Sequence, residues 1–171
     1  MEKRAKAAGF TLIELLVVVA IVGIIAAIAV PNLLLAMQRA KQRRTMVDMR
    51  DIATAWEARA TEIGRYNAAG GVAGADQEID VKDLSSYLAP TYIREMPVHD
   101  AWSKPFLCFM DQPVGSANVA QRYALVSGGH DETVSSDIHN GPFTDFDCDI
   151  VYANGLFLSY PEGTQVLKQD P

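Results

Sequence analysis

Residues 10–37 read FTLIELLVVVAIVGIIAAIAVPNLLLAM, an apolar run in which Glu14 is the only charged residue. An α-helix rises about 1.5 Å per residue, so roughly 20 apolar residues cross the hydrocarbon core of a bilayer. This run is long enough to span a membrane. Lys3, Arg4 and Lys6 precede it, so the positive-inside rule predicts a cytoplasmic N-terminus and a single pass across the membrane.

The charge is divided unevenly along the 171 residues. Residues 38–65 carry a net charge of +3 and residues 66–171 a net charge of −10, within a total of −6. A nucleic-acid-binding protein is usually basic, so the balance argues against a nucleic-acid partner. The hydrophobic share of 49% excludes a disordered polar chain.

Two ordinary interpretations of the apolar run remain open at this point. One is a secretory signal peptide, with a small-residue cleavage site at residues 26–29. The other is a plain signal anchor. Neither accounts for Glu14, because a carboxylate inside a membrane helix costs roughly 2.5–3.5 kcal/mol on insertion scales. Such a carboxylate requires a partner, and residues 10–37 contain none.

The N-terminal segment closely resembles the signature of type IV prepilins. Residues 9–17 read GFTLIELLV behind a short basic leader, and Pro31 stands where that family has a proline. The resemblance implies that a prepilin peptidase removes residues 1–9 by cutting between Gly9 and Phe10, and that the new amino group of Phe10 is methylated. It also implies assembly roles for Glu14 and Pro31, with the Glu14 carboxylate pairing with the Phe10 ammonium of a neighbouring subunit.

The same resemblance implies the partners and the location of the mature chain. It would be anchored in the inner membrane, surrounded by lipid, with its C-terminal domain in the periplasm. It would assemble into a homo-oligomeric filament in the periplasm or at the cell surface. Minor pilins or pseudopilins and an inner-membrane assembly platform would be its further partners. A simple membrane-anchored binding protein is a third class of function that stays open.

The helix is expected to continue beyond the membrane to about residue 64, broken or kinked near Pro31. Apolar residues recur at steps of three and four, which is typical of an amphipathic helix. They are Leu34, Met37, Ala40, Met46, Met49, Ile52, Ala53, Trp56 and Ala60.

Residues 66–171 predict a small antiparallel β-sheet packed on the rear half of this helix. Strands are expected at 106–110, 122–127, 150–153 and 156–160, with Asn154-Gly155 forming a type I′ hairpin turn. Residues 67–80 predict a loop, 81–88 a short helix capped by Asp80, and 165–171 a loose polar tail. The fold class is therefore α+β, with a leader at 1–9, a transmembrane half-helix at 10–37 and a globular domain at 38–171.

Two segments of the domain resemble the major pseudopilins of type II secretion systems. Residues 100–106 read DAWSKPF and residues 123–129 read YALVSGG, against D-P-W-G-x-P-Y and Y-S-L-G-A-D-G in that family. Ala101, Ser103 and Gly128 depart from the pattern. The resemblance implies a pseudopilus subunit for protein secretion; a type IV pilus subunit for adhesion, motility or DNA uptake is the alternative.

Residues 129–149 form an acidic segment, GHDETVSSDIHNGPFTDFDCD. Carboxylates in a loop suit Ca²⁺, and the resembling pseudopilins bind Ca²⁺ in the corresponding loop. Asp131 and Asp137 are the candidate ligands by resemblance, and Asp147 by proximity. An ordinary solvated acidic loop is the alternative.

Cys108 and Cys148 are the only cysteines. A periplasmic domain lies in an oxidising compartment, where such pairs tend to close, so a disulfide between them is expected. Two buried thiols are the alternative.

No pattern in the sequence indicates an enzyme. His99, His130 and His139 lack the spacing of a metal-binding H-E-x-x-H motif, and Ser127 lacks the glycine that precedes the nucleophile in G-x-S-x-G. A structural, non-catalytic protein is therefore expected, with Ca²⁺ as its one candidate cofactor.

Overall fold

The computed structural model describes residues 10–63, 77–112, 122–135 and 140–166. By its internal packing the chain divides into two units, Met1–Met37 and Gln38–Pro171. Helix α1 (Leu12–Ile63) contributes to both, and Pro31 does not break it. Within the first unit every described apolar side chain of α1 is exposed or half-buried, as expected for a helix that packs against no other element of its own unit.

Within the second unit, α1 turns one face inward from Gln42 onward. The residues buried there are Gln42, Thr45, Met49, Ile52, Ala53, Ala55, Trp56 and Ala60. Most are the apolar residues that the periodicity predicts. Gln42 and Thr45 are polar members of the same face, which an apolar count does not detect.

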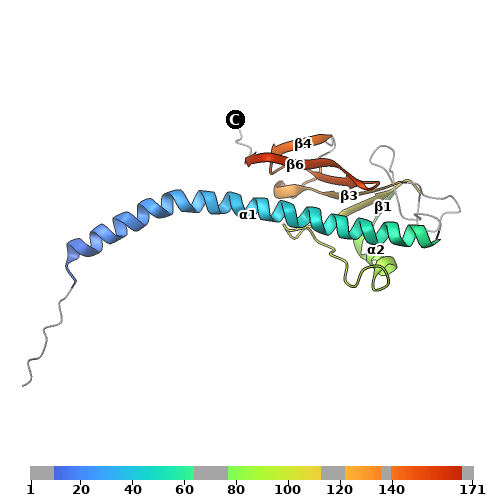
Figure 1. Cartoon of the computed structure of the whole chain (residues 1–171), viewed down its shortest axis with the longest axis horizontal. Helices are drawn as coiled ribbons and strands as arrows, with labels where there is room; N and C mark the ends of the chain where they lie inside the picture. Colours follow the sequence, from blue (N-terminus) through green and yellow to red (C-terminus); the bar gives the residue numbers. More distant parts are fainter. Residues whose placement is uncertain (1–9, 64–76, 113–121, 136–139, 167–171) are drawn as a thin grey trace, which may run out of the picture. The chain divides into compact units, whose positions relative to one another are not determined.

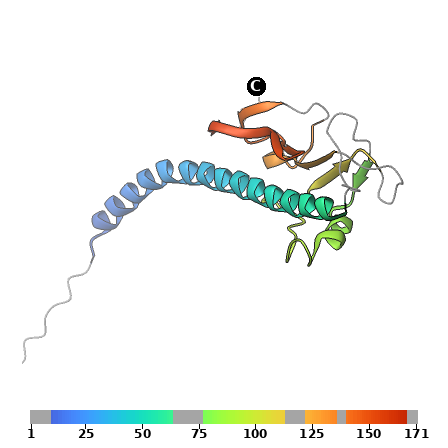
Figure 2. The same cartoon turned by 45° about the vertical axis from the view of Figure 1, so that its right-hand side comes forward.

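A six-stranded sheet packs against this face in the order β1-β2-β3-β5-β6-β4. The strands are β1 (Gln77–Ile79), β2 (Leu107–Met110), β3 (Tyr123–Ser127), β4 (Gly141–Asp145), β5 (Ile150–Ala153) and β6 (Leu156–Val166). Figures 1 and 2 show β4 and β6 on one side of the C-terminal part of α1, and helix α2 (Val81–Leu88) on the other. The predicted α+β class is confirmed.

The core lies between α1, α2 and the sheet. Trp56 of α1 is fully buried, and its ring centroid lies 5.1 Å from that of Tyr123 on β3. Leu84 and Leu88 of α2 join the same cluster. Burial of such side chains contributes about 1.5–3 kcal/mol each.

Several predicted elements are confirmed in place. Asp80 caps α2, accepting a hydrogen bond from the Lys82 backbone N–H at 2.7 Å. Asn154 and Gly155 both have positive φ angles, +49° and +87°, as a type I′ turn between β5 and β6 requires.

Other predictions about the sheet are wrong. Residues 77–79 form β1 rather than part of a loop, because they pair with Cys108–Met110 of β2. Strand β4 was not expected, and it pairs with β6 in parallel, so the sheet is not purely antiparallel. Strand β6 continues to Val166, and Gln165 is buried rather than part of a loose tail.

The predicted disulfide is not formed in this structure. Cys108 lies opposite Leu125 of β3, and Leu125 lies opposite Tyr152 of β5. Two strand spacings amount to roughly 10 Å, and Cys148 lies a further four residues along the chain from Tyr152. Cysteine Cα atoms more than about 7 Å apart cannot be bridged without backbone movement.

Candidate functional site

Glu14 caps the N-terminus of α1 together with Thr11. Its Oε2 accepts hydrogen bonds from the backbone N–H of Thr11 at 2.8 Å and from Thr11 Oγ1 at 2.7 Å. In return, Thr11 Oγ1 accepts from the backbone N–H of Glu14 at 3.3 Å. This is a capping box, in which two otherwise unpaired backbone donors are satisfied reciprocally. Among the described residues of a single chain, Glu14 is therefore bonded to Thr11 and to no basic side chain.

The structure describes two of the other three residues predicted to function in this region. Phe10 is described and 78% exposed, and Pro31 lies within α1. Gly9 lies outside the described residues. Among those residues, α1 is long and apolar enough to cross a membrane, with a mean hydropathy of 3.0 over its most apolar window of 18 residues.

The turn after Asp100 fixes the D-x-W-x-x-P-F segment to the body. Asp100 is buried, and its Oδ1 accepts from the backbone N–H groups of Trp102 and Lys104, each at 2.9 Å. Its Oδ2 accepts from Ser127 Oγ at 2.7 Å. The Asp100 carboxylate therefore joins the turn to the end of β3. In the sequence Asp100 is recognisable only as the first residue of the DAWSKPF motif, and nothing there indicates this role.

The same turn is tied to α1 by two further hydrogen bonds. Trp102 Nε1 donates to Gln38 Oε1 at 2.9 Å, and the backbone N–H of Ala101 donates to Thr45 Oγ1 at 3.2 Å. These contacts explain why the inner face of α1 contains polar residues. The two segments resembling pseudopilins, 100–106 and 123–129, are thus parts of one structure.

The acidic segment begins in a tightly wound loop after β3. A Cβ at Gly128 would lie 2.8 Å from the Thr133 backbone, and one at Gly129 would lie 2.8 Å from the Cys148 carbonyl oxygen. Gly129 also has a φ of +68°. A side chain at position 128 does not fit this conformation, which gives a physical reason for the departure from the family pattern there.

The predicted calcium ligands differ in how they are engaged. Asp131 accepts two hydrogen bonds from Thr133, and Asp147 Oδ1 lies 2.7 Å from His130 Nδ1. Asp137 lies outside the described residues. Within the part of the chain that the structure describes, no three His, Cys, Asp or Glu side chains form a metal-binding group.

Asp149, which was not among the predicted ligands, is the most unusual carboxylate of the loop. It is 4% exposed, and its Oδ1 is buried with no hydrogen-bond partner, while Oδ2 accepts from the Ser135 backbone N–H at 2.8 Å. Burial raises the pKa of Asp149, and the nearby Asp131 charge raises it further. A buried, unpaired carboxylate oxygen is a group that a cation would satisfy.

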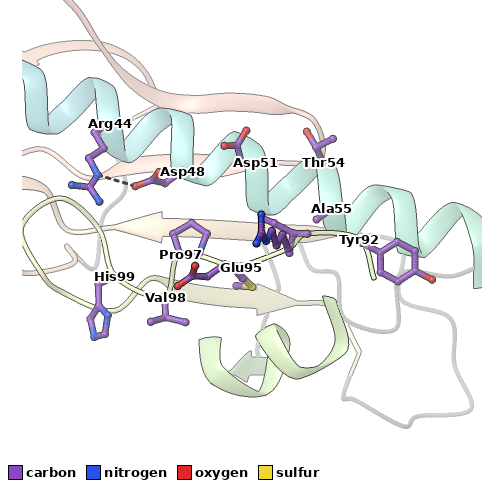
Figure 3. A pocket seen from close by; sticks show the side chains of 13 residues that line it. Arg44, Asp48, Asp51, Thr54, Ala55, Tyr92, Glu95, Pro97, Val98 and His99 are labelled. Carbon is purple, nitrogen blue, oxygen red and sulfur yellow. Dashed lines mark ion pairs between the residues drawn. The ribbon is translucent and has the colours of Figure 1, made fainter. Parts of the chain in front are cut away.

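A separate open groove of about 760 Å³ runs between α1 and the segment 92–99. Figure 3 shows Arg44 directed toward Asp48 at one end of it and Tyr92 at the other. Arg44 and Arg94 line it together with Asp48, Asp51 and Glu95. Burial raises the pKa of Asp48, the neighbouring Asp51 charge raises it too, and the Arg44 guanidinium opposes both.

Comparison with known proteins finds one family motif and several relatives. Residues 4–30 match the prokaryotic N-terminal methylation motif. The type II secretion system core protein G of Aeromonas hydrophila is 28% identical over 148 residues, which cover 85% of this chain and 99% of that protein. The chain is thus similar to type IV pilins and pseudopilins.

Other relatives divide between the branches of the superfamily. Core protein G of Vibrio cholerae is 28% identical over 149 residues, covering 85% of this chain and 99% of that protein. The type IV major pilin protein PilA of Myxococcus xanthus is 46% identical over 59 residues, 34% of this chain but only 27% of PilA. No solved structure matches. The comparisons point to a structural protein rather than an enzyme.

Proposed function

We propose that this chain is the major subunit of the pseudopilus of a type II secretion system. The similarity to core protein G carries the proposal, because it extends over 85% of the chain and not only over the N-terminal motif at residues 4–30. The buried Asp100 adds support, since it joins the two body segments that resemble that branch.

We propose that a prepilin peptidase removes residues 1–9 and that Phe10 is then N-methylated. The mature chain would have 162 residues, which is 171 minus the nine of the leader. Intact-mass measurement of protein from membranes tests this directly. An unprocessed N-terminus at Met1 would contradict it.

We propose that Glu14 exchanges partners on assembly. In one chain it accepts two hydrogen bonds from Thr11. Cleavage would create an ammonium group at Phe10 of each neighbouring subunit, and a bond between a carboxylate and an ammonium is charged on both sides, whereas the Thr11 donors are neutral. The pairing would favour subunits in one axial register, because only one offset brings a carboxylate to an ammonium.

We propose that the acidic loop binds Ca²⁺ through Asp131 and Asp149, with Asp137 as a further ligand. Asp149 supports this, because its buried Oδ1 has no partner. A bound cation would neutralise two carboxylates that repel each other. Asp147 is a weaker candidate, because its Oδ1 is already in contact with His130.

The location and the remaining partners follow from the same proposal. The subunit would be stored in the inner membrane through α1, with a cytoplasmic N-terminus and a periplasmic body. It would enter the filament at an inner-membrane assembly platform, together with minor pseudopilins.

The function is tested by deleting the gene in its host and assaying proteins released into the medium. We expect secreted proteins to accumulate in the periplasm, and a plasmid copy of the gene to restore their release. Normal secretion in the deletion strain, with loss of sheared surface filaments, would instead support a type IV pilus subunit. The match to PilA, 46% identical over 59 residues, is the observation that favours this second candidate.

A further inference from the structure

A small pocket of about 310 Å³ lies where β6 meets the first turns of α1 that belong to the body. Its lining residues are Arg39, Gln42, Arg43, Met46, Pro161, Glu162, Gly163 and Gln165. Gln165 is buried here and fixed in place, since its Nε2 donates to the Phe143 carbonyl at 2.9 Å and to the Glu162 carbonyl at 3.0 Å. The pocket therefore has a polar floor that is already hydrogen-bonded.

The two arginines of this pocket lack partners in the part of the chain that the structure describes. Arg39 Nε is buried and donates to no hydrogen-bond acceptor, and neither Arg39 nor Arg43 forms an ion pair there. Glu162 is the one carboxylate in the lining, so the lining charges sum to +1. A guanidinium with a buried, unused donor is suited to an oxyanion, and phosphate oxygens match its geometry.

The two arginines of the pocket lie close in sequence to the apolar run, and this position indicates which kind of anion they bind. Arg39 comes two residues after Met37, the last residue of the apolar run, which is about 3 Å along a helix. Lys41 and Arg44 make four basic residues within residues 39–44, with no acidic residue among them. Basic clusters immediately beside a membrane span are typical of binding to anionic lipid headgroups. In the proposed topology this cluster also lies on the periplasmic side of the membrane, where the positive-inside rule predicts few basic residues.

We propose that Arg39 and Arg43 bind the phosphodiester of an anionic phospholipid headgroup while the subunit is stored in the membrane. The pocket's charge of +1 matches a phosphodiester with one negative charge. The headgroup would satisfy Arg39 Nε and hold the body at a fixed depth before assembly. This inference rests on the membrane-inserted state described under the proposed function.

Lipid selectivity of the full chain in bilayers tests the proposal. Spin-labelled phosphatidylglycerol and spin-labelled phosphatidylcholine are compared by electron spin resonance, which separates lipid in contact with protein from free lipid. We expect phosphatidylglycerol to be preferred at the protein about two- to threefold, and the preference to fall toward onefold in 1 M NaCl. Absence of any protein-contact lipid would mean that the chain is not inserted, which is a failure of the proposed function rather than of the pocket.

Matched variants separate the pocket from general charge. Arg39→Gln with Arg43→Gln is expected to abolish the preference, and Arg39→Lys with Arg43→Lys to retain part of it. Lys82→Gln with Arg94→Gln removes the same charge from exposed sites elsewhere on the body and is expected to leave the preference unchanged. Circular dichroism of each variant verifies that it is folded.

Three results would overturn the proposal. The first is an equal association of the two lipids with the original chain. The second is a preference that survives the Arg39→Gln, Arg43→Gln change, above all if that variant fails to form filaments, since the pocket would then contact the acidic body of another copy. The third is loss of the preference when 10 mM glycerol phosphate is added, because the pocket would then take a free phosphate compound.

Discussion

The carboxylate of Asp100 joins a surface turn to the interior of the body. It accepts hydrogen bonds from two backbone N–H groups of the turn and from Ser127 on β3. Removing such an acceptor leaves buried donors unsatisfied, and each of these costs about 1–3 kcal/mol. The effect of a single residue here is therefore comparable with a large part of the stability of a domain.

We expect Asp100→Ala to lower the free energy of unfolding by about 2–4 kcal/mol, because three donors lose their acceptor. Urea titration of the full chain in detergent, followed by tryptophan fluorescence, measures this. Asp51→Ala, at an exposed position of α1, is the control and should change stability by less than about 0.5 kcal/mol. Equal stability of the two variants would contradict the role given to Asp100.

Asp149 is predicted to make stability depend on pH and on Ca²⁺. Its pKa is raised in the folded chain by burial and by Asp131, so the carboxyl group costs folding free energy as it ionises, and stability is lost as the pH rises through that raised pKa. We expect Asp149→Asn to melt no lower than the original chain in EGTA at pH 7. Its advantage should shrink as the pH falls toward 4.

With Ca²⁺ in place of EGTA, the original chain should melt at a higher temperature than Asp149→Asn. A cation that binds only the folded state raises the melting temperature of the original chain, whereas Asp149→Asn should lose this response. Asp83→Asn, on α2, serves as the control and should keep it. A normal calcium response in Asp149→Asn would remove Asp149 from the site.

At the scale of elements, the loop after β3 contains two close backbone approaches besides its side-chain hydrogen bonds. The strongest involves Gly129, which has a φ of +68° and lies against the carbonyl oxygens of Phe146 and Cys148. The hairpin turn at Gly155 also has positive φ, but a Cβ there would find only Glu57 Oε1, at 3.6 Å. Both glycines have a positive φ, but only at Gly129 is there no room for a Cβ atom.

We expect Gly129→Ala to cost more than about 2 kcal/mol, since it adds a backbone clash to the strain of a left-handed conformation. Gly155→Ala should cost only about 1–2 kcal/mol, the conformational part alone. Thermal unfolding of both variants compares them. The prediction is wrong if Gly155→Ala proves the more damaging.

The sheet register leads to a prediction about the cysteines. Cys108 is fully buried on β2, and burial raises the pKa of its thiol well above the usual range. We expect Cys108 to resist maleimide labelling until the chain is unfolded, and dithiothreitol to leave the melting temperature unchanged. A large drop in melting temperature on reduction would show that a disulfide does form.

The elements that the sequence predicted correctly are those whose own residues specify them. Helix α1 follows from apolar periodicity, α2 from its Asp80 cap, and the β5–β6 hairpin from Asn154-Gly155. Strands β1 and β4 could not be predicted this way. Strand β1 has three residues with one apolar side chain, and β4 begins with Gly141-Pro142, a turn signal, so both are strands only because a neighbour pairs with them.

The candidate site shows the same division. Glu14 could be found because a charge inside an apolar run is conspicuous. Asp149 could not be distinguished from the other acidic residues of its segment, because its burial depends on the folding of the loop around it. The disulfide was wrong for a related reason: the separation of Cys108 and Cys148 depends on strand order, which the sequence does not display.

At the scale of the whole molecule, the chain consists of two units with different tasks. The described residues of Met1–Met37 include no buried side chain, while Gln38–Pro171 contains the described hydrophobic core. A change in the first unit should therefore affect assembly and leave the stability of the second unit intact.

We expect Glu14→Ala to reduce filament yield more than tenfold while the melting temperature of the body stays unchanged. Leader removal should also proceed, so that the defect lies in assembly. Filaments recovered by shearing or crosslinking, together with the mass of the processed chain, measure these effects. Glu14→Asp is the matched control, since it keeps the charge and shortens the side chain, and should assemble partly. Full assembly of Glu14→Ala would refute the proposed pairing.

The place of β6 in the sheet has a consequence for biosynthesis. Strand β6 is the last described element of the chain, yet it lies between β5 and β4 and bonds to both. If the body is exported as proposed, residues 150–166 would cross the membrane after all the other described strands. Until then β3 would lack its neighbour β5, and β4 would lack its neighbour β6, so the sheet would be completed only at the end of export.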